Sequence, residues 1–422
     1  MTHKQLQIAV CGCGPAGLAA ALLLNRDGHR VRLFDQFEAP RPLGSGLILQ
    51  PTGLAVLETL GLRERLAQLG APIVRLYGRA TPSQRVVLDV RYRALGPGIK
   101  ALAVHRAALF GVLHEAVQCS DVDIVTRKRI EKLDRAGAKP TLLTPAGERL
   151  GAFDLVVDAL GANSPLAPRT RRTVLAYGAL WTNVAWPASG AFTADALEQR
   201  YQRASHMAGL LPIGRRAADA GAEAAFFWSL KRTDVSRWRE RGVDAWKEDV
   251  AALWPEAAPL LQNVAHADDL TFAQYDHFTH PQPWSERLVH IGDAAHATSP
   301  QLGQGANMAL LDALALAGAL RASPEVADAL PHYARLRRWH VRLFQWASAV
   351  FTPFYQSDSR LLPFIRDRIA APISRLPIGD QILARLVSGM TVRPLAGIDF
   401  GEPQGSRRKS ENTKKNDLSR PV

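Results

Sequence analysis

The chain has 422 residues, of which 47% are hydrophobic and 22% are charged, so its composition excludes a disordered or fibrous protein. At about 150 residues per domain, this length predicts two or three domains with large cores. The formal net charge of +13 suits an anionic partner. However, the sequence shows no basic stripe interleaved with aromatic residues and no nucleic-acid motif, so we expect no specific nucleic-acid partner.

The cysteine content and the hydropathy pattern indicate the compartment. Three cysteines, Cys11, Cys13 and Cys119, are too few for a disulfide scaffold and fit a reducing environment. No apolar run reaches the ~18 residues that a membrane-spanning helix needs. We therefore expect a cytoplasmic protein without a membrane span. Peripheral contact with a membrane stays open, because Arg, Trp and Phe mix across residues 339–364, although packing of these helices onto the protein explains them more simply.

The first part of the chain alternates strand and helix patterns. An apolar run at 5–11, an Ala/Leu-rich helix at 15–26 and a second apolar run at 30–35 form a βαβ unit. Such a unit implies a parallel sheet with helices on its faces. Helical periodicity returns at 52–69 and 105–117, and the run at 153–158 reads as another buried strand.

The pattern changes after residue 170. Residues 173–233 read as strands rich in Trp, Tyr, Phe and Val, and a polar-faced helix follows at 237–261. A strand at 288–291 and a helix at 305–320 come next, and then Arg-rich helical patterns at 331–351 and 360–387. We predict an α/β fold: a doubly wound, Rossmann-like domain in three pieces (1–72, 100–170 and 283–330), an inserted antiparallel-sheet substrate domain (73–99 and 171–282), a helical C-terminal layer (331–400) and a disordered basic tail (401–422).

A glycine-rich turn joins the first strand to the first helix. Gly12, Gly14 and Gly17 form a GxGxxG motif with Pro15 and Ala16 between them. The spacing predicts a tight turn, a close backbone approach to a pyrophosphate, and close packing of the helix on the strand. Asp35 ends the second strand, where a carboxylate accepts hydrogen bonds from an adenosine ribose.

A second motif lies far along the chain. Asp293 follows a buried strand in the segment Gly292-Asp293-Ala-Ala-His296, and Pro300, Gly303, Gly305 and Asn307 lead into the long helix. We expect Asp293 to accept hydrogen bonds from a polyol, and the amides at the helix start to stabilise an anion.

The two motifs in this order resemble the class A (single-component) FAD-dependent monooxygenases, the aromatic hydroxylases typified by p-hydroxybenzoate hydroxylase. The resemblance spans about residues 5–320 and implies the p-hydroxybenzoate hydroxylase fold with FAD as cofactor and NADH or NADPH as co-substrate. It implies that Asp293 binds the ribityl chain and that Asn307 lines the flavin ring. The residues that it places on FAD are Gly12, Gly14, Pro15, Ala16, Gly17, Asp35, Arg41, Arg106, Asp293, Pro300, Gly303, Gly305 and Asn307.

The chain departs from the family at one motif. The family's middle segment reads approximately Gly-Ala-Asp-Gly-Ala-x-Ser with a later Arg, whereas this chain has Asp158-Ala-Leu160-Gly161-Ala-Asn-Ser164 and then Arg169. Leucine cannot make a carboxylate's hydrogen bonds. This departure puts the nicotinamide interaction in question and leaves the choice between NADH and NADPH open.

The resemblance implies an enzyme that uses O₂ and hydroxylates or epoxidises an electron-rich, aromatic small molecule through a flavin C4a-hydroperoxide. A flavin-dependent reductase or dehydrogenase and a halogenase on the same fold are the alternatives, followed by a flavin-binding scaffold or a nucleic-acid binder. We expect no metal, because the spacing of His277, His280, His290 and His296 fits no closed ligand set. The flavin carries the chemistry, so no catalytic side chain is assigned. Aromatic residues that face either the substrate or the sheet core are Trp181, Phe226, Phe227, Trp228 and Tyr275.

Overall fold

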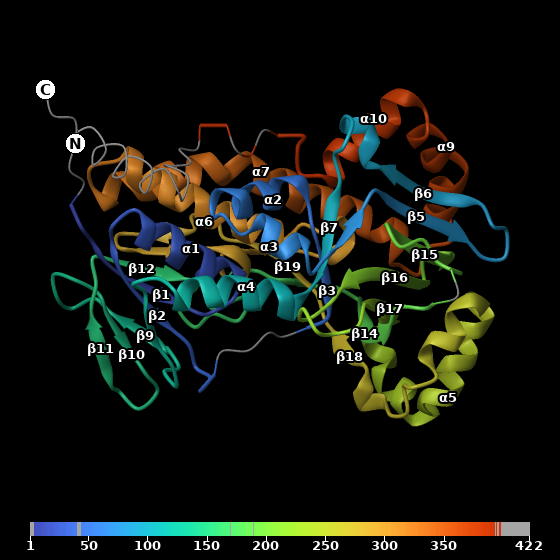
Figure 1. Cartoon of the computed structure of the whole chain (residues 1–422), viewed down its shortest axis with the longest axis horizontal. Coiled ribbons are helices and arrows are strands. Elements are labelled where there is room, and N and C mark those ends of the chain that lie inside the picture. Colours follow the sequence, from blue (N-terminus) through green and yellow to red (C-terminus); the bar gives the residue numbers. More distant parts are fainter. Residues whose placement is uncertain are drawn as a thin grey trace, which may run out of the picture.

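The structure is a computed structural model, and it describes residues 4–39, 44–168, 170–188, 190–392, 394 and 396–397. The predicted basic tail therefore lies outside the described residues. Two large sheets stand side by side, with a layer of helices along one edge of both (Figure 1). The fold is the mixed α/β fold expected for the p-hydroxybenzoate hydroxylase family.

The first sheet is built around the N-terminal strand. Parallel pairing joins β1 to β2 and β12, and further parallel pairs add β8 and β21 at the two sides. The strand order is β20 (Trp284–Ser285), β21 (Leu288–His290), β12 (Leu155–Asp158), β1 (Gln7–Cys11), β2 (Arg30–Phe34) and β8 (Asp123–Val125).

The two faces of this sheet are covered differently. Ile8 and Val10 pack into the core under the helices, whereas Ala9 and Cys11 pack into a second core with Leu142. The second core lies under a three-stranded sheet, not under helices, so the prediction of a doubly wound domain with helices on both faces is wrong. The chain between β8 and β12 forms a short antiparallel meander, which covers that face instead. The helices that cover one face are α1 (Pro15–Arg26), α4 (Arg106–Gln118) and α6 (Gly305–Ala322). The strands that cover the other face are β9 (Lys132–Asp134), β10 (Thr141–Leu143) and β11 (Arg149–Ala152).

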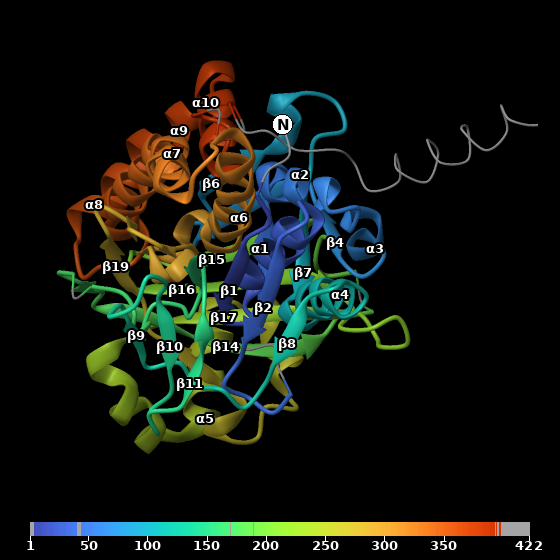
Figure 2. The same cartoon turned by 90° about the vertical axis from the view of Figure 1, so that its left-hand side faces the viewer.

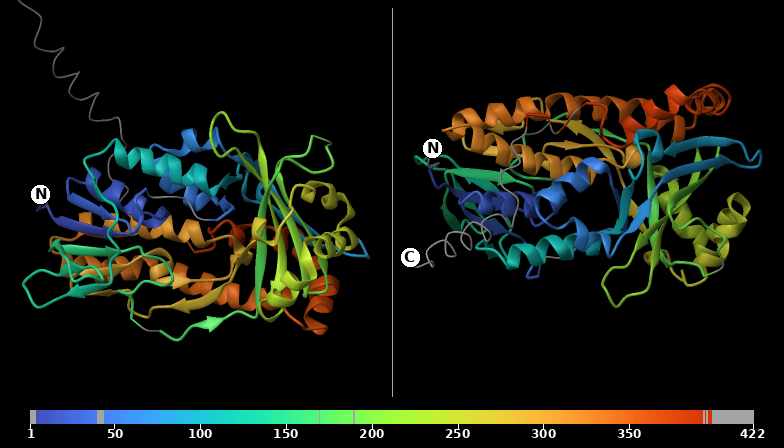
Figure 3. Two further views of the ribbon diagram at one scale, coloured as in Figure 1. Left: turned by 90° about the horizontal axis from the view of Figure 1, so that it is seen from below. Right: turned by 45° about the horizontal axis from the view of Figure 1, so that its top comes forward.

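The second sheet has seven strands and joins two distant parts of the chain. β5 pairs in parallel with β15, so backbone hydrogen bonds join the segment before residue 100 to the segment after residue 171. Figure 3 shows this sheet beside the first one, with α5 (Val235–Leu253) on its outer side, and in the view of Figure 2 it lies behind the first sheet. The strand order is β18 (Thr271–Ala273), β14 (Tyr177–Ala185), β17 (Glu223–Lys231), β16 (His206–Gly214), β15 (Ala196–Gln202), β5 (Arg75–Ala80) and β6 (Val86–Arg91).

Smaller elements connect the two sheets. The strands β3 (Gly46–Leu49), β7 (Ala101–His105) and β4 (Ala71–Ile73) form a sheet between them, followed in space by α2 (Pro51–Thr59) and α3 (Arg63–Ala67). The predicted helix at 52–69 is therefore two helices, separated at Gly61, whose φ of +72° ends the first one. A third small sheet contains β13 (Thr173–Val174), β19 (Asp276–Thr279) and β22 (His296–Ala297).

The remaining helices complete the layers. The helix α5 (Val235–Leu253) is interrupted at Gly242, where φ is +81°. The helix α7 (Val326–Tyr355) packs on α6 and is longer than the predicted 331–351. The predicted helix at 360–387 is four short pieces, namely α8 (Leu361–Ile365), a π-helical turn (Arg366–Ala370), α9 (Ala371–Ser374) and α10 (Pro377–Val387). No helix of the described residues is long and apolar enough to cross a membrane.

Candidate functional site

The glycine-rich turn after β1 has little room for side chains on its protein side. Gly12 has φ of +106°, and its N–H donates to the Phe34 carbonyl at 2.8 Å. A Cβ atom added to Gly17 would lie 1.9 Å from the Gly12 oxygen, so α1 packs directly on the turn. A Cβ atom added to Gly14 would meet no protein atom within 4 Å. The backbone at Gly14 is thus free to approach a bound group closely.

Asp35 holds this turn from the neighbouring strand. Its Oδ2 accepts from the Cys13 N–H at 3.1 Å, and its Oδ1 accepts from the Phe37 N–H at 2.9 Å. These two bonds orient the carboxylate, and each oxygen keeps a lone pair for a further donor. Burial, together with the nearby charge of Asp35, raises the pKa of Cys13 well above its usual range, so this thiol stays protonated.

A cavity of about 600 Å³ opens beside the turn, within the usual range of cofactor sites. Both α1 and α6 begin at this cavity, so two positive helix ends and their free N–H groups face it. These helices lie far apart in the sequence, since α1 begins at Pro15 and α6 at Gly305. The sequence-predicted residues on the cavity wall are Gly12, Gly14, Pro15, Ala16, Asp35, Arg106, Asp293 and Gly305.

Arg106 is placed by the start of α4. The Nδ1 atom of His105 accepts from the Ala107 N–H at 3.0 Å and caps this helix, while the Arg106 N–H donates to the Ser45 carbonyl at 2.9 Å. The side chain of Arg106 then lies along Gly44, where an added Cβ atom would come within 3.0 Å of it. The backbone of Arg106 is therefore fixed, and its side chain packs against Gly44.

Asp293 stands on a turn that the core holds rigidly. Gly292 adopts φ of +58°, and its N–H donates to the Asp312 carboxylate at 2.8 Å. The Asp293 side chain opens onto the cavity and is exposed there. Desolvation raises the pKa of Asp293 above its ordinary value, although His296 and Arg106 oppose this rise. Such a carboxyl group is well suited to hydroxyl groups, which donate without adding charge.

Several predicted residues do not line the cavity. Gly17 is used in packing, and Pro300 and Gly303 lie in the loop before α6. Asn307 is buried, and its side chain bonds the Gln50 N–H at 2.8 Å and the Ile48 carbonyl at 3.1 Å. It therefore ties α6 to β3 rather than facing the cavity. Arg41 lies outside the described residues.

The cavity wall also contains residues that the sequence analysis missed. Lys128 and Arg129 follow β8, and Gln36 and Phe37 follow β2. Their place in the fold could have identified them as wall residues. The carboxyl ends of parallel strands meet at one edge of a sheet, and ligands bind there. No local motif marks Lys128 or Arg129.

The altered middle motif also lies at this wall, through Leu160, Gly161 and Asn163. Asp158 does not replace the missing carboxylate there. It is fully buried, and its oxygens accept from the Leu160 N–H at 3.1 Å and the Ser164 hydroxyl at 2.7 Å and contact His290 Nδ1 at 2.7 Å. The cavity wall therefore presents an apolar side chain at residue 160. Arg169 lies outside the described residues.

The candidate aromatic residues divide between the two faces of the seven-stranded sheet. Phe226 and Trp228 are buried against Trp246 of α5, at centroid distances of 6.1 and 6.5 Å, so they belong to the sheet core. Trp181 and Phe227, 4.8 Å apart, lie on the opposite face, which packs toward β3. Trp181 Nε1–H donates to the Tyr275 hydroxyl at 2.9 Å. Of these candidates, only Trp181, Phe227 and Tyr275 lie on the side of the domain that contains the cofactor cavity.

The four histidines have separate protein partners. His296 Nε2 lies 2.8 Å from the Asp312 carboxylate, His290 contacts Asp158, and His277 Nε2 accepts from the Ser299 N–H at 2.8 Å. The fourth, His280, contacts the Thr170 hydroxyl through Nδ1. Across the part of the chain that the structure describes, no group of three or more His, Cys, Asp or Glu side chains is arranged to hold a metal ion.

The comparisons with known proteins agree with this geometry. The sequence matches the family described as "FAD binding domain" over residues 5–342. The 3-amino-4-hydroxybenzoate 2-monooxygenase of Streptomyces cremeus is 31% identical over 363 residues, which cover 80% of this chain and 84% of that protein. The 6-hydroxynicotinate 3-monooxygenase of Pseudomonas fluorescens is 26% identical, over 75% of this chain and 82% of that protein.

Solved structures show the same fold. The tetrameric form of 2-methyl-3-hydroxypyridine-5-carboxylic acid oxygenase superposes with a TM-score of 0.73 at 23% identity, covering 86% of this chain and 96% of the other. A Klebsiella pneumoniae HpxO variant complexed with FAD superposes with a TM-score of 0.74 at 20% identity. With a family match over most of its length, a cavity at two helix N-termini and these relatives, the chain belongs to the class A FAD-dependent monooxygenases, the aromatic hydroxylases, and its cofactor is FAD.

Proposed function

We propose that this protein hydroxylates an electron-rich aromatic ring bearing a hydroxyl or amino group, with NADH or NADPH as the reductant. In this reaction the ring, O₂, NAD(P)H and one proton give the hydroxylated ring, water and NAD(P)⁺. One oxygen atom enters the product and the other leaves as water. The observation that carries the proposal is the placement of the aromatic face of the seven-stranded sheet beside the domain that contains the cofactor cavity.

The residues on the cavity wall fit FAD. The turn at Gly12 and Gly14, with the start of α1, suits the pyrophosphate, and Asp35 suits the adenosine ribose. Asp293 suits the ribityl hydroxyls, and Arg106 suits an anionic part of the cofactor. When bound, FAD supplies the transfer of electrons from the reductant to O₂ and the oxygen that the substrate receives.

The start of α6 is the electrostatic element of the site. Gly305 and Ala306 belong to its first turn and line the cavity. The helix dipole and the free N–H groups stabilise negative charge at this point, by about 0.3–1 kcal/mol at exposed sites and more in enclosed ones. We expect this end to favour the anionic form of a reduced flavin ring.

The substrate chamber lies, in this proposal, against Trp181 and Phe227. Tyr275 accepts a hydrogen bond from Trp181, which leaves its own hydroxyl proton available to a substrate oxygen. Burial raises the pKa of Tyr275 to about 12, so the phenol stays protonated and remains a donor at neutral pH. The charge of Arg106 also acts on Tyr275, which links this wall to the cofactor cavity.

The relatives support the substrate class. Their names specify rings with a hydroxyl group, 3-amino-4-hydroxybenzoate and 6-hydroxynicotinate. A hydroxyl or amino group enriches the ring in electrons, as attack on an electrophilic oxygen requires. A flavin-dependent reductase is the second candidate, because Leu160 stands where the family has a carboxylate that serves nicotinamide binding.

Rapid-mixing measurement of flavin reduction tests the proposal. Without O₂, the holoprotein is mixed with NADH or NADPH in the presence of phenols, aminophenols, hydroxypyridines or hydroxyquinolines, and flavin absorbance is followed. We expect one ring class to accelerate reduction, and its product to contain one ¹⁸O atom when ¹⁸O₂ is then supplied. Reduction by NAD(P)H with no labelled product from any ring would favour the reductase instead.

A further inference from the structure

The C-terminal helices α8–α10 expose large apolar side chains. Seven aliphatic or aromatic residues between Leu361 and Ile382 are between 50% and 76% exposed. Isolated exposed apolar residues are ordinary, but a row of them on consecutive elements marks an interaction surface. We call this row the apolar ridge, and it consists of Leu361, Phe364, Ile369, Ile373, Leu376, Ile378 and Ile382.

The π-helical turn keeps the ridge on one side. Leu361 and Phe364 are three residues apart, and Ile369 and Ile373 are four apart, which are the spacings of one helix face. Between Phe364 and Ile369 the spacing is five, and the π-helical turn at Arg366–Ala370 lies at that point. A π-turn adds about one residue per turn, so it returns Ile369 to the same side. Leu361, Phe364, Ile369 and Ile373 therefore continue one exposed stripe.

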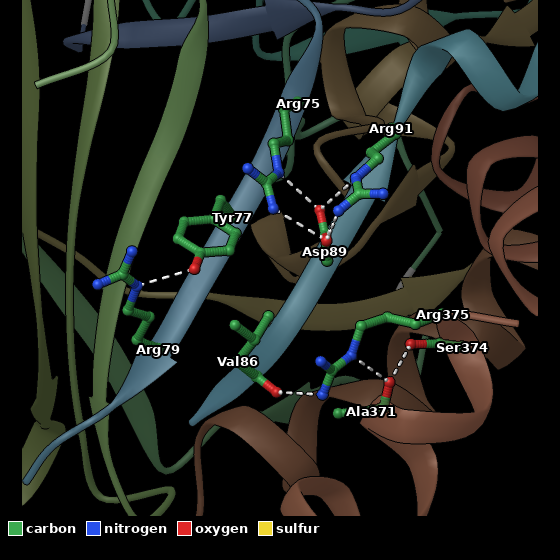
Figure 4. A network of polar contacts seen from close by, with 9 residues as sticks. All are labelled: Arg75, Tyr77, Arg79, Val86, Asp89, Arg91, Ala371, Ser374 and Arg375. Atoms are coloured by element: carbon green, nitrogen blue, oxygen red, sulfur yellow. Dashed lines mark hydrogen bonds and ion pairs between the residues drawn. The ribbon is translucent and has the colours of Figure 1, made fainter. Parts of the chain in front are cut away.

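The ridge belongs to a segment that is fastened to the protein. The buried Arg366 donates to the Phe354 carbonyl at 2.9 Å and to the Arg203 carbonyl at 3.0 Å. Arg375 donates to the Val86 carbonyl of β6 at 3.3 Å and to the Ala371 carbonyl at 3.2 Å (Figure 4). The opposite side of α10 packs into the core through Ala384 and Val387. The ridge is therefore an outward face of a docked layer.

Positive charge accompanies the ridge. Arg360, Arg368 and Arg385 are exposed and lie within three residues of a ridge member. None of the three forms an ion pair with a carboxylate of the described residues, and Arg368 lies 5.8 Å from the centroid of the Phe364 ring. Asp367 is already bonded to Arg366 at 2.7 Å. Asp380 of α10 is the other carboxylate that lies between ridge members, so the three arginines leave the surface with an excess of positive charge beside its apolar area.

We propose that the apolar ridge docks on the surface of an anionic lipid bilayer. Apolar side chains flanked by arginines are the composition of helices that lie in a membrane interface, where the apolar groups enter the acyl boundary and the cations meet anionic headgroups. Trp339 and Trp346, on the outer side of the neighbouring α7, add two exposed residues of a type enriched at that depth. A second copy of the chain fits less well, because a two-fold contact would bring this positively charged patch against the same patch of the other copy.

Vesicle co-sedimentation of the full-length holoprotein tests the proposal and needs no turnover. Vesicles of phosphatidylcholine alone are compared with vesicles containing 30% phosphatidylglycerol, at low and high salt. The ridge variant carries Ile373→Ser, Ile378→Ser and Ile382→Ser, and the charge variant carries Arg368→Gln and Arg385→Gln. Val174→Ser, at an exposed valine on β13, is the matched control, and flavin content and thermal unfolding verify that each variant is folded.

We expect the wild-type protein and V174S to bind the anionic vesicles alike and to dissociate as salt rises. The ridge variant should bind at least tenfold less, and each arginine removed should weaken binding about fivefold. A tail variant, with Arg407→Gln, Arg408→Gln and Lys409→Gln, separates the ridge from the basic C-terminal residues. Absence of wild-type binding, or binding that only the tail variant abolishes, overturns the proposal. A wild-type dimer that the ridge variant turns into a monomer, without vesicle binding, assigns the ridge to a second copy instead.

Discussion

The Asp312 carboxylate of α6 lies 2.8 Å from the imidazole of His296 and thereby fixes the turn that presents Asp293 to the cofactor cavity. The same carboxylate accepts from Arg337 Nε at 2.6 Å, and both Asp312 and Arg337 are buried. Asp312→Asn would place an amide N–H against these donors and leave the Arg337 charge uncompensated. We expect the free energy of unfolding to fall by about 3–5 kcal/mol, measured by urea unfolding at pH 7.

The same variant has a defined dependence on pH. Burial alone would raise the pKa of Asp312, but His296 and Arg337 outweigh it and hold that pKa well below its ordinary value. The ionised carboxylate therefore stabilises the fold above about pH 4, the unfolded pKa, and this contribution is lost as pH falls from there toward the folded pKa. The stability difference between wild type and D312N should be constant from pH 5 to 8 and should narrow below pH 4. A difference that widens in acid would contradict the assignment.

The buried His340 leads us to expect a second loss of stability in acid, which begins at milder pH than that of Asp312. Burial lowers the pKa of His340 to about 2, and the charge of Arg337 adds to this effect. Between about pH 6.5 and 2 the unfolded chain binds a proton at this site and the folded chain does not, so the free energy of unfolding falls as pH falls. The expected loss from this residue is about 1.5 kcal/mol between pH 6.5 and 5.

The variant His340→Leu isolates this contribution. Its free energy of unfolding should fall less steeply than that of the wild type between pH 6.5 and 5. Above pH 7.5 the two proteins should differ by a constant amount, which reports packing against Phe344, 4.7 Å away. Parallel curves over the whole range would mean that His340 takes up a proton in the folded protein.

The glycines of the first turn predict two different defects. Gly17→Ala places Cβ 1.9 Å from the Gly12 oxygen, which is backbone, so we expect a loss of about 2–3 kcal/mol or more in unfolding free energy. Gly14→Ala meets no protein atom within 4 Å, so its fold should persist while the new methyl group occupies the cofactor side. We expect its FAD dissociation constant to rise roughly tenfold or more, from impaired hydrogen bonds to the pyrophosphate.

Gly111→Ala serves as the matched control for these glycines. Gly111 lies on the exposed side of α4, and an added Cβ atom meets nothing within 4 Å. Alanine is favoured over glycine in a helix interior, so stability should be unchanged or slightly higher, with normal FAD affinity. Calorimetry of the apoproteins and fluorescence titration with FAD distinguish the three outcomes. Equal loss of FAD affinity in G17A and G14A, at unchanged stability, would contradict the packing argument.

The local motifs predicted the first turn well because their geometry depends on neighbours in sequence. The helix predicted at 15–26 is α1, and Gly12, Gly14 and Asp35 meet at one cavity. Asn307 shows the limit of this reasoning. Its position in a motif suggested a wall residue, but its side chain satisfies the Gln50 N–H and the Ile48 carbonyl, which lie 257 and 259 residues away in the sequence. Such long-range pairing leaves no trace in the local pattern.

The second sheet face shows the same limit. Hydrophobic periodicity indicates that Ala9 and Cys11 of β1 are buried, but not what covers them. The cover is a meander whose strands have only three or four residues, too short for a periodic signal. Likewise, alternation along β17 separates Phe226 and Trp228 from Phe227, while the sequence does not tell which face meets the cofactor domain.

Trp181 and Trp228 provide the decisive comparison for the proposed substrate chamber. Trp228 is buried against α5, so Trp228→Ala should cost about 3–5 kcal/mol of unfolding free energy and leave the KM for the aromatic substrate nearly unchanged. Trp181 is half-buried on the opposite face and holds the Tyr275 hydroxyl. Trp181→Ala should destabilise the protein less, yet raise the KM and uncouple NAD(P)H oxidation from product formation, because water reaches the reacting flavin. Chemical unfolding, substrate kinetics and hydrogen peroxide assays separate these effects. A larger rise in KM for W228A than for W181A would place the substrate on the α5 side and overturn the proposed chamber.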